Sequence, residues 1–547
     1  MSAVMSTRRD VLLGGAAATT LLLAPQNKAL PANLLLRPDI ATPTGQTMLG
    51  LYAAAVRAMQ DPAINYPPQP QSWTFQVYIH AVPVNPFDPA VSGYLYGDKL
   101  KKRIDDIYGN PTNGTPQAAW KEAALQCWAK CEHLTPYFTT WHRWYLYYFE
   151  RICRKMCKDP GFMLPYWNYA SDNGPSLQLP DRFRQASRDP NNPNVLFFDD
   201  RGLGFADANA TGPQTVKMNN GGFMPFSLTR YDAALAATEM FPSDDQHHMP
   251  SDPTASVYLD LGFTGRLECV PHGNVHDFVG GWMGNVPSAA GDPIFFVHHC
   301  QIDRLYASWE AELGVSYNWD SSNIQPDENT WKTTKAAFID ESGQLANVKL
   351  GDAINTSSLG YSYDILVQPS SAEVAALPTE TRLDPTLLKL AAMKSSAFNV
   401  QSGGTTVTLT PTARPEDAKP APHRDRPHTL VLSGLKLLRR PPAPLGVFIN
   451  LPTGTPPRLN NPYYVGTLNL FNFDLGTGVP MTHTEKMNHD HDVPGATVRF
   501  DVTEILLQQR TKGQWDGGAV TITISTFGAD TPGDITYVTI ESATITP

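Results

Sequence analysis

The sequence predicts a mainly α-helical domain with many loops, followed by an antiparallel β-sandwich. Helical periodicity over residues 118–158, a second helical block over about 267–314, and short β-rich runs after residue 428 support this fold class. With 41% hydrophobic and only 17% charged residues, the chain can bury large cores, which excludes wholesale disorder. A net charge of −10 without a long basic run disfavours nucleic acid and anionic membranes as partners.

Residues 1–32 have the features of an export signal. Arg8 and Arg9 precede an apolar stretch that ends at Pro25 and is too short to span a bilayer. Adjacent arginines followed by two leucines resemble a twin-arginine signal, the route of proteins that fold before export, as a rule with a cofactor. We therefore expect a periplasmic or secreted protein; a frayed hydrophobic N-terminus is the alternative.

Composition divides the rest of the chain into three parts. Residues 33–366 hold the helical patterns, and we expect them to form the catalytic domain. Residues 367–427 are expected to be a linker, because prolines and charges crowd its end at 411–427. Residues 428–547 alternate between β-rich runs and turn signals, which predicts the β-sandwich.

The spacing of the histidines indicates a metal centre. His272 and His276 are four residues apart, so a helix would place both imidazoles on one face, where they could chelate one metal. His298 and His299 are adjacent and point to different sides of a helix, so at most one of them joins the same site.

Three further histidines, His80, His133 and His142, form a second candidate set earlier in the chain. Two sets of three imidazoles without a paired carboxylate cluster predict an all-nitrogen site. Imidazole suits copper, zinc, iron and nickel, and two adjacent all-nitrogen centres favour a redox pair of coppers that binds O2.

Two segments resemble the copper-binding signatures of the type 3 copper proteins, namely tyrosinases, catechol (polyphenol) oxidases and hemocyanins. Residues 133–150 contain His-x8-His-Arg-x-Tyr-Leu-x3-Glu, and residues 292–304 read Asp-Pro-x-Phe-x2-His-His-x3-Asp-Arg. The resemblance implies a four-helix bundle around two copper ions, with O2 as co-substrate. It implies six ligands, His80, His133 and His142 for the first copper and His272, His276 and His299 for the second, with His298 as a non-ligand.

Cys131 lies two residues before His133. Fungal tyrosinases and molluscan hemocyanins have this Cys-x-His pattern, in which a thioether joins the sulfur to an imidazole carbon. The resemblance thus implies a thioether between Cys131 and His133, which would fix the orientation of the ring. The alternative is a free, buried thiol.

Four positions around the site carry the resemblance further. Glu268 is similar to the glutamate that holds a water near the coppers in plant polyphenol oxidases, although a glutamate favoured at a helix start is the alternative. Gly273 stands where many tyrosinases have an asparagine that assists monophenol hydroxylation, so diphenol oxidation is favoured. Val286 stands where several plant enzymes have a phenylalanine that gates the pocket. The smaller valine leaves more room, which favours monophenol hydroxylation. Phe295 matches the aromatic residue beside the ligand histidines.

The C-terminal part resembles the β domain of plant enzymes, which often covers the copper site until it is cleaved. The Pro-rich run at 411–427 would then be the cut site of an activating protease. Arg37 and the tyrosines at 361 and 363 resemble the pair that ties the ends of the catalytic domain together.

Taken with the resemblance, the residues predict a dicopper oxidase that uses O2 to convert o-diphenols (catechols) to o-quinones, with weak monophenol hydroxylation. The alternatives are a tyrosinase with full monophenolase activity and an o-aminophenol oxidase. A hemocyanin-like O2 carrier is disfavoured, because one site in a single exported chain gives little cooperativity.

Overall fold

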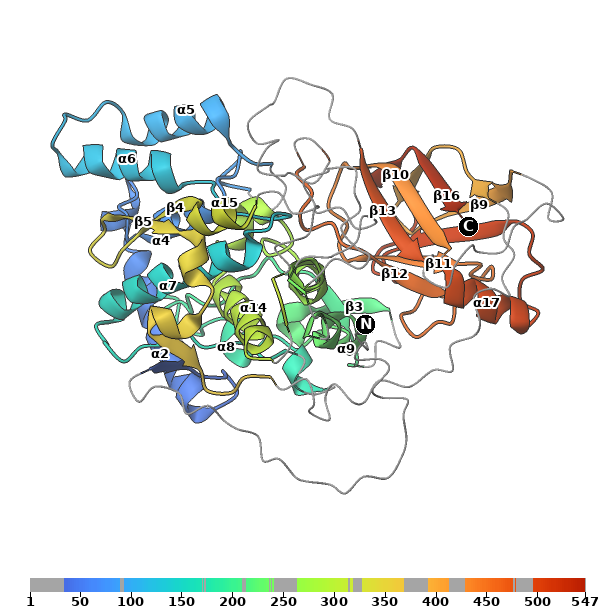
Figure 1. Cartoon of the computed structure of the whole chain (residues 1–547), viewed down its shortest axis with the longest axis horizontal. Helices are drawn as coiled ribbons and strands as arrows, with labels where there is room; N and C mark the ends of the chain where they lie inside the picture. Colours follow the sequence, from blue (N-terminus) through green and yellow to red (C-terminus); the bar gives the residue numbers. More distant parts are fainter. Residues whose placement is uncertain are drawn as a thin grey trace, which may run out of the picture. The chain divides into compact units, whose positions relative to one another are not determined.

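The computed structural model describes residues 34–88, 93–169, 171, 174–208, 213–235, 237, 239–240, 263–312, 315–317, 327–367, 392–412, 428–475, 478 and 495–546. The predicted export signal and residues 413–427 of the predicted Pro-rich run 411–427 lie outside this set. Residues Leu35–Pro547 form one compact unit, with helices first and strands after them (Figure 1).

The catalytic part is mainly helical, as predicted. Two of its helices begin at good capping signals: Thr42 caps α2 with Pro43 at the first helical position, and Ser72 caps α4. The helices are α2 (Pro43–Met59), α3 (Pro62–Asn65), α4 (Trp73–His80), α5 (Gly97–Tyr108), α6 (Pro116–Cys127), α7 (Phe138–Cys157), α8 (Asp181–Arg184), α9 (Phe226–Thr229), α10 (Asp232–Leu235), α11 (Phe263–Leu267), the π-helical η4 (Glu268–Gly273), α12 (Asn274–Val279), α13 (Val286–Ala289), α14 (Ile294–Glu310) and α15 (Glu328–Thr333).

Short pieces complete this part. They are the 3₁₀ turns η2 (Pro175–Leu177), η3 (Met218–Asn220), η5 (Leu350–Ala353) and η6 (Thr356–Leu359), and the strand pairs β1 (Leu35–Arg37) with β6 (Tyr361–Tyr363), β2 (Leu203–Phe205) with β3 (Gln214–Lys217), and β4 (Lys335–Ile339) with β5 (Leu345–Lys349). The parallel pair β1–β6 ties the two ends of the catalytic part together, as the resemblance implies.

The expectation of one helical stretch over 118–158 is wrong. Helix α6 ends at Cys127 and α7 begins at Phe138, and a loop of irregular backbone joins them. Ala129 and Leu134 in this loop have left-handed φ values of 54° and 55°. Pro136 disfavours a helical conformation at the residue before it, which is consistent with the break. The loop carries Cys131 and His133.

Helices α7 and α14 form the centre of the catalytic core. The ring of Phe149 on α7 stacks on Phe296 of α14, with centroids 3.5 Å apart. Buried ion pairs join the same two helices: Arg143 of α7 pairs with Asp303 of α14, and Arg37 pairs with both Asp303 and Glu150. Packing and charge together fix the relative position of the two helices.

The C-terminal part is antiparallel β structure, as predicted. Its ten described strands follow the order β12-β11-β14-β9-β7-β16-β10-β15-β8, with β13 paired to β10. In β10 and β14 buried and half-buried residues largely alternate, and the buried ones join a separate hydrophobic core. The elements are β7 (Met393–Lys394), β8 (Phe398–Gln401), β9 (Thr405–Pro411), β10 (Thr429–Leu437), β11 (Leu445–Ile449), β12 (Tyr464–Leu468), β13 (Ala496–Asp501), α17 (Thr503–Thr511), β14 (Val520–Ser525), β15 (Thr536–Ile540) and β16 (Ser542–Thr546).

The predicted linker boundary needs a correction. Strands β7, β8 and β9 fall within 367–427, yet they pair with β16, β15 and β14 of the C-terminal sheet. The β part therefore begins near Met393 instead of at 428. The Pro-rich run 413–427 connects β9 to β10, so it lies between two strands of the β part and not between the two parts.

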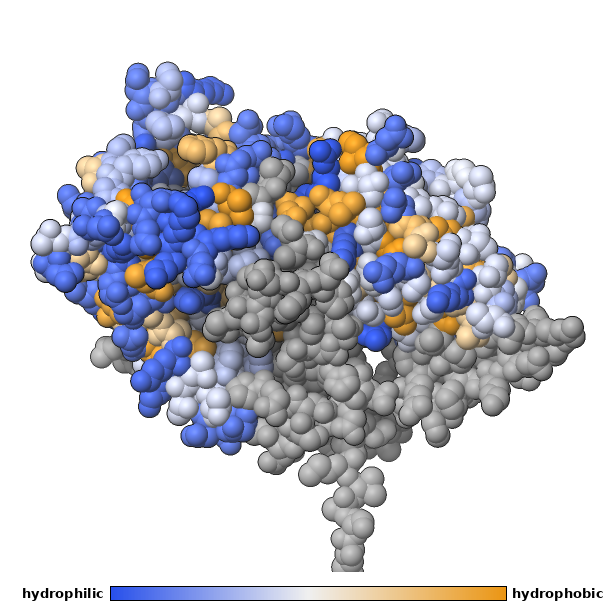
Figure 2. Space-filling view, turned by 90° about the horizontal axis from the view of Figure 1, so that it is seen from above, coloured by the Kyte–Doolittle hydropathy of each residue, from blue (hydrophilic) through white to orange (hydrophobic). Residues whose placement is uncertain are grey.

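No helix within the described ranges is long and apolar enough to cross a membrane. Figure 2 shows one face of the molecule, on which apolar residues gather in separate patches among hydrophilic ones.

Candidate metal centre

One group of histidines is built on helices. His272 lies on η4, His276 on α12 and His299 on α14, and all three are buried. The Nδ1 atoms of His272 and His276 contact the carbonyl oxygens of Glu268 and Met283 at 2.9 and 2.8 Å. Each ring therefore turns its Nε2 atom away from the backbone, and the Nε2 atoms of His276 and His299 lie 3.3 Å apart.

The other group comes from three separate elements. His80 ends α4, His133 lies in the loop after α6, and His142 is on the first turns of α7. The Nδ1 atom of His80 lies 3.1 Å from the Val286 carbonyl oxygen, and that of His142 lies 2.8 Å from the Phe138 oxygen. The ring centroid of His133 lies 5.3 Å from that of His80 and 5.2 Å from that of His142.

The two groups face each other. The rings of His142 and His299 stack with centroids 4.6 Å apart, and those of His133 and His272 are 5.5 Å apart. Burial, together with the neighbouring histidines, holds the pKa values of His272 and His299 well below the ordinary value, so these imidazoles are neutral. Neutral imidazole is the form that binds a metal.

These donors fit a pair of metal ions. A ring that donates from Nδ1 to a carbonyl presents the lone pair of Nε2, which is the usual orientation of a metal-bound histidine. The buried Nε2 of His272 has no hydrogen-bond partner within the described part of the chain. The Nε2 atoms of His276 and His299 are 3.3 Å apart. This separation allows one ion to lie at the usual metal–imidazole distance of about 2.0 Å from both nitrogens. All-imidazole donors suit copper.

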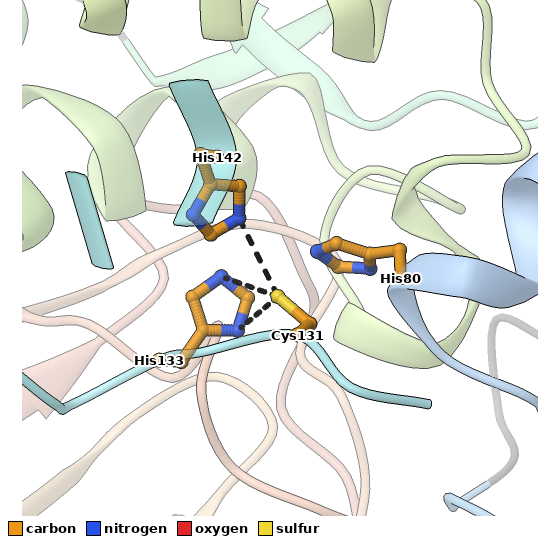
Figure 3. A group of neighbouring side chains, drawn as sticks. All are labelled: His80, Cys131, His133 and His142. Atoms are coloured by element: carbon orange, nitrogen blue, oxygen red, sulfur yellow. Dashed lines mark hydrogen bonds between the residues drawn. The ribbon is translucent and has the colours of Figure 1, made fainter. Parts of the chain in front are cut away.

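Each group also contains a fourth donor. Cys131 joins His80, His133 and His142, and His298 joins His272, His276 and His299, with all ligand atoms of a group within 4.8 Å of one another. Figure 3 shows the sulfur of Cys131 between the rings of His133 and His142, at 3.5 Å from Nδ1 of the former and 3.4 Å from Nε2 of the latter. The placement of His298 was not expected from sequence, which assigned it no ligand role.

Comparison with known proteins agrees with this geometry. Residues 70–312 match the common central domain of tyrosinase, and they contain all the histidines of both groups. Residues 70–312 are therefore similar to the central domain of tyrosinases. The chain is an enzyme of this kind, and its two buried histidine groups are suited to binding two copper ions.

The resemblance extends beyond the central domain. Tyrosinase HcTyr1 of Hahella sp. (strain CCB-MM4) is 27% identical over 485 residues, covering 86% of this chain and 90% of the relative. The chloroplastic polyphenol oxidase of Malus domestica is 25% identical over 487 residues, covering 80% and 74%. Latent apple tyrosinase has the same fold, with a TM-score of 0.50 at 21% identity over 94% of this chain and 97% of that structure.

The structure places two further predicted site residues, Phe295 and Val286, beside these histidines. The Phe295 ring packs on His299, with centroids 4.1 Å apart, and on His80 at 4.9 Å. Val286 is buried, and its carbonyl contacts His80, a role that the sequence did not indicate.

Glu268 links the two copper groups. One of its carboxylate oxygens accepts a hydrogen bond of 2.7 Å from the backbone N–H of Leu134, the residue after His133. Its carbonyl holds His272. Burial raises the pKa of the Glu268 carboxyl to about 8. The hydrogen bonds from the N–H of Leu134 and the amide of Asn472 act in the other direction and lower this pKa.

Residues of the C-terminal part reach into the metal centre. We call 469–473 the covering segment. The ring of Phe471 stacks on His276, with centroids 3.8 Å apart and planes 13° apart, and meets His272 and His133 edge to face at 5.4 and 5.6 Å. Phe471 thus contacts histidines of both groups.

Gly273 is the position into which the covering segment fits. A Cβ atom at Gly273 would lie 1.9 Å from Nδ2 of Asn469 and 2.8 Å from its Cγ. That amide donates to the carbonyl oxygen of Cys269 at 3.2 Å. The side chain that the catalytic part lacks at 273 is therefore replaced in space by an asparagine from the C-terminal part.

Two charged residues hold the covering segment. Arg440, which is half-buried, donates to the carbonyl oxygens of Leu470, Phe471 and Phe473. Asp277, the residue after His276, accepts from the N–H of Leu470 at 3.0 Å. Burial raises the pKa of Asp277 to about 7. The Arg440 guanidinium and the N–H groups of Leu470 and Phe471 act in the other direction and lower this pKa.

These contacts could not be predicted from the sequence. The covering segment, Arg440 and Asp277 lie far apart in sequence, and neither spacing nor periodicity connects them. The resemblance indicated that a C-terminal domain covers the site but left open which side chain does so. The one local sign was the absence of a side chain at 273.

Proposed function

We propose that the enzyme oxidises o-diphenols to o-quinones, two molecules of diphenol for each O2 reduced to water. His80, His133 and His142 hold the first copper, and the other copper is bound by the three helical histidines. Two copper ions held there would supply O2 binding and would accept the electrons of the diphenol. The observation that carries the proposal is the pair of buried, histidine-rich groups that face each other.

The residues around the coppers define the chain's own contribution. The carbonyls of Val286, Phe138 and Met283 orient three of the rings, so little reorganisation is needed when a substrate arrives. Phe295 and the face of His276 provide an apolar platform for the substrate ring. We assign Glu268 the role of holding a water that receives the phenolic protons, because its carboxylate lies between the elements that carry His133 and His272.

Gly273 supports a preference for diphenols over monophenols. Without a side chain, this residue cannot polarise a water beside Glu268, and the amide of Asn469 occupies the space only while the covering segment is in place. Val286 favours the alternative, a tyrosinase with full monophenolase activity, because its small side chain leaves the pocket open. An o-aminophenol oxidase is a further alternative that uses the same site.

We also propose that the C-terminal part keeps the enzyme latent, with Phe471 as the blocking residue. A cut between β6 and β7 would detach the whole β sheet, whereas a cut at 413–427 would leave β7 to β9 on the catalytic part. An activating protease therefore acts between β6 and β7. The twin-arginine route would export the folded, copper-loaded chain.

A thioether between Cys131 and His133 is the third proposal, and the short distance from the sulfur to the ring supports it. Its formation joins Sγ to a ring carbon and removes the thiol and ring hydrogens, with O2 as the oxidant. The product would fix His133, the one ligand that lies in a loop.

The test compares substrates on the copper-loaded full chain, before and after limited proteolysis. Catechol should be oxidised at once, whereas tyrosol should react after a long lag or not at all. Prompt hydroxylation of tyrosol would contradict the role assigned to Gly273 and favour a full tyrosinase. Faster turnover of o-aminophenol than of catechol would favour that alternative. Reversible O2 uptake without turnover would contradict an oxidase.

A further inference from the structure

His299 differs from the other helical histidines in how its ring is held. The Nδ1 atoms of His142, His272 and His276 lie 2.8, 2.9 and 2.8 Å from backbone carbonyl oxygens. Nδ1 of His299 is buried and has no hydrogen-bond partner within the described part of the chain. A metal-bound histidine almost always donates its other ring N–H to a carboxylate, a carbonyl or a water, because this bond fixes the tautomer and orientation of the ring. For His299 a water is the remaining candidate.

A small cavity adjoins this ring, between α7 and α14. Its volume is about 10 Å³, and it is lined by Thr139, His142, His299, Ile302, Asp303 and Tyr306. One water molecule needs about this much space. The site is shielded from solvent, because Thr139, His299 and Asp303 are only 4%, 1% and 4% exposed. A buried water also needs two to four polar partners, so the lining must supply acceptors as well as the N–H of the ring.

Asp303 can supply the first acceptor. Its Oδ2 atom accepts hydrogen bonds from three donors, namely Arg37, Tyr361 and Tyr363. Its Oδ1 atom accepts from Arg143 alone among the described residues. A carboxylate oxygen has two lone pairs, so Oδ1 can accept one further hydrogen bond.

Thr139 can supply the second acceptor. Tyr317 donates its hydroxyl hydrogen to Glu310 at 2.7 Å, so Tyr306 is the donor in its own 2.6 Å contact with Tyr317. Burial raises the pKa of Tyr306, and the hydroxyl of Thr139 acts in the other direction as a donor. With its hydrogen turned to Tyr306, Thr139 has its lone pairs available. No group of the described residues donates to its Oγ1 atom.

We propose that one structural water in this cavity accepts from Nδ1 of His299 and donates to Oδ1 of Asp303 and Oγ1 of Thr139. Three hydrogen bonds are the usual number for a buried water. They would fix Nε2 of His299 as the atom that faces the second copper, and the carboxylate behind the water makes the imidazole a stronger ligand. Thr139 and Asp303 are thus positioning residues that act through the water. The inference rests on the proposed function, since it takes His299 as a ligand of the second copper.

Three variants of the full chain separate this role from packing. Thr139→Val keeps the shape of the side chain but cannot accept a hydrogen bond from the water. Thr139→Ser keeps the hydroxyl and should restore the wild-type behaviour. Thr140→Val is the matched control, because Thr140 is the next buried threonine of α7 and its hydroxyl contacts the Tyr137 carbonyl, 3.4 Å away, outside the cavity.

High-resolution crystal structures of the copper-loaded chain give the first measurement. We expect electron density for one water within hydrogen-bond distance of His299, Asp303 and Thr139 in the wild type, in Thr139→Ser and in Thr140→Val. Thr139→Val should lack it. The wild-type structure alone decides whether the water exists, even if Thr139→Val fails to fold.

Copper binding gives the second measurement. Crystals equilibrated with a graded series of copper-buffered solutions, measured by anomalous scattering at the copper absorption edge, give the occupancy of each site separately. Thr139→Val should weaken binding at the second copper site about tenfold or more and leave the first site unchanged, because loss of an outer partner of a ligand histidine has this effect. Thr139→Ser and Thr140→Val should bind copper like the wild type.

The inference is wrong if the wild-type cavity shows no water, or if Nδ1 of His299 bonds directly to a protein atom. Unchanged affinity at the second site in Thr139→Val would also overturn it, as would an equal loss in Thr140→Val. A chain that binds two coppers and shows the water, yet does not oxidise catechol, would support this inference and contradict the proposed function.

Discussion

The two copper groups are built differently. The second places His272 and His276 on the consecutive helical segments η4 and α12 and takes His299 from α14. The first combines the end of α4, a loop and the start of α7, and His133 belongs to no regular element. A ligand on a helix is positioned by the helix itself, whereas a ligand in a loop needs contacts of its own.

The contacts around His133 supply what its backbone lacks. Cys131 lies against the ring, Glu268 accepts from the N–H of Leu134, and Phe471 packs on the ring from the C-terminal part. The first group therefore depends on more distant parts of the molecule than the second does, and this asymmetry can be measured.

Removal of a ligand gives the largest effect. His276→Ala and His133→Ala should each reduce bound copper from two ions to one per chain and lower catechol oxidation by about 10³-fold or more, because catalysis needs both ions. Copper analysis and O2 consumption measure the two effects. Retention of both ions in either variant would contradict the ligand assignment.

Asp303→Asn tests the link between the two groups. Asp303 on α14 pairs with Arg143 on α7, the helices that carry His299 and His142. Loss of one partner from a buried pair should lower the free energy of unfolding by about 3–5 kcal/mol. Urea unfolding measures this, and Asp106→Asn, in an exposed pair with Lys102, is the control.

The lowered pKa of Asp303 predicts that the protein loses stability at acid pH. Burial alone would raise the pKa of Asp303, but Arg143 and Arg37 hold it below its ordinary value. A carboxyl whose pKa is lowered by folding stabilises the folded protein when the pH is above the carboxyl's pKa in the unfolded state, which is near 4. This stabilisation is lost as the pH falls through the carboxyl's pKa in the folded state. The wild-type protein should lose stability below about pH 4, and Asp303→Asn should lose less over that interval. Equal acid sensitivity would contradict this assignment.

Phe471→Ala tests the cover over both groups. Loss of a buried phenylalanine destabilises the closed arrangement, so catechol oxidation by the full chain should rise about ten- to a hundredfold. Phe473→Ala is the matched control, because Phe473 belongs to the separate core of the C-terminal part. An equal rise in both variants would indicate general loosening of the C-terminal part instead of removal of a blocking ring.

Cys131→Ser gives the smallest expected effect and acts on the first group alone. Without the thioether, copper affinity of that group should fall about tenfold, while the second group keeps its affinity. Mass spectrometry of the peptide around Cys131 in the wild type should show the loss of two hydrogen atoms. An intact thiol with unchanged affinity in the variant would contradict the bond.

The difference between the groups also explains what the sequence could predict. The spacing of His272 and His276 has a direct meaning on a helix, and the structure places both in one group. The loop around His133 was predicted as helix, because its apolar pattern continues through residues whose backbone is left-handed. Hydrophobic periodicity indicates which face of a helix or strand is buried, but it does not indicate where the element ends.

Long-range contacts were beyond sequence reasoning for the same reason. The strands after 428 were recognisable by alternation, whereas β7 to β9 were read as linker because their partners lie more than a hundred residues away. The fit between Gly273 and Asn469 likewise exists only in the folded chain.

The most direct test is to load the full chain with copper, count the ions and follow O2 and o-quinone during catechol oxidation. Two ions per chain, and two quinones formed for each O2 consumed, are the expected result. One ion per chain, or O2 uptake without quinone, would contradict a dicopper diphenol oxidase.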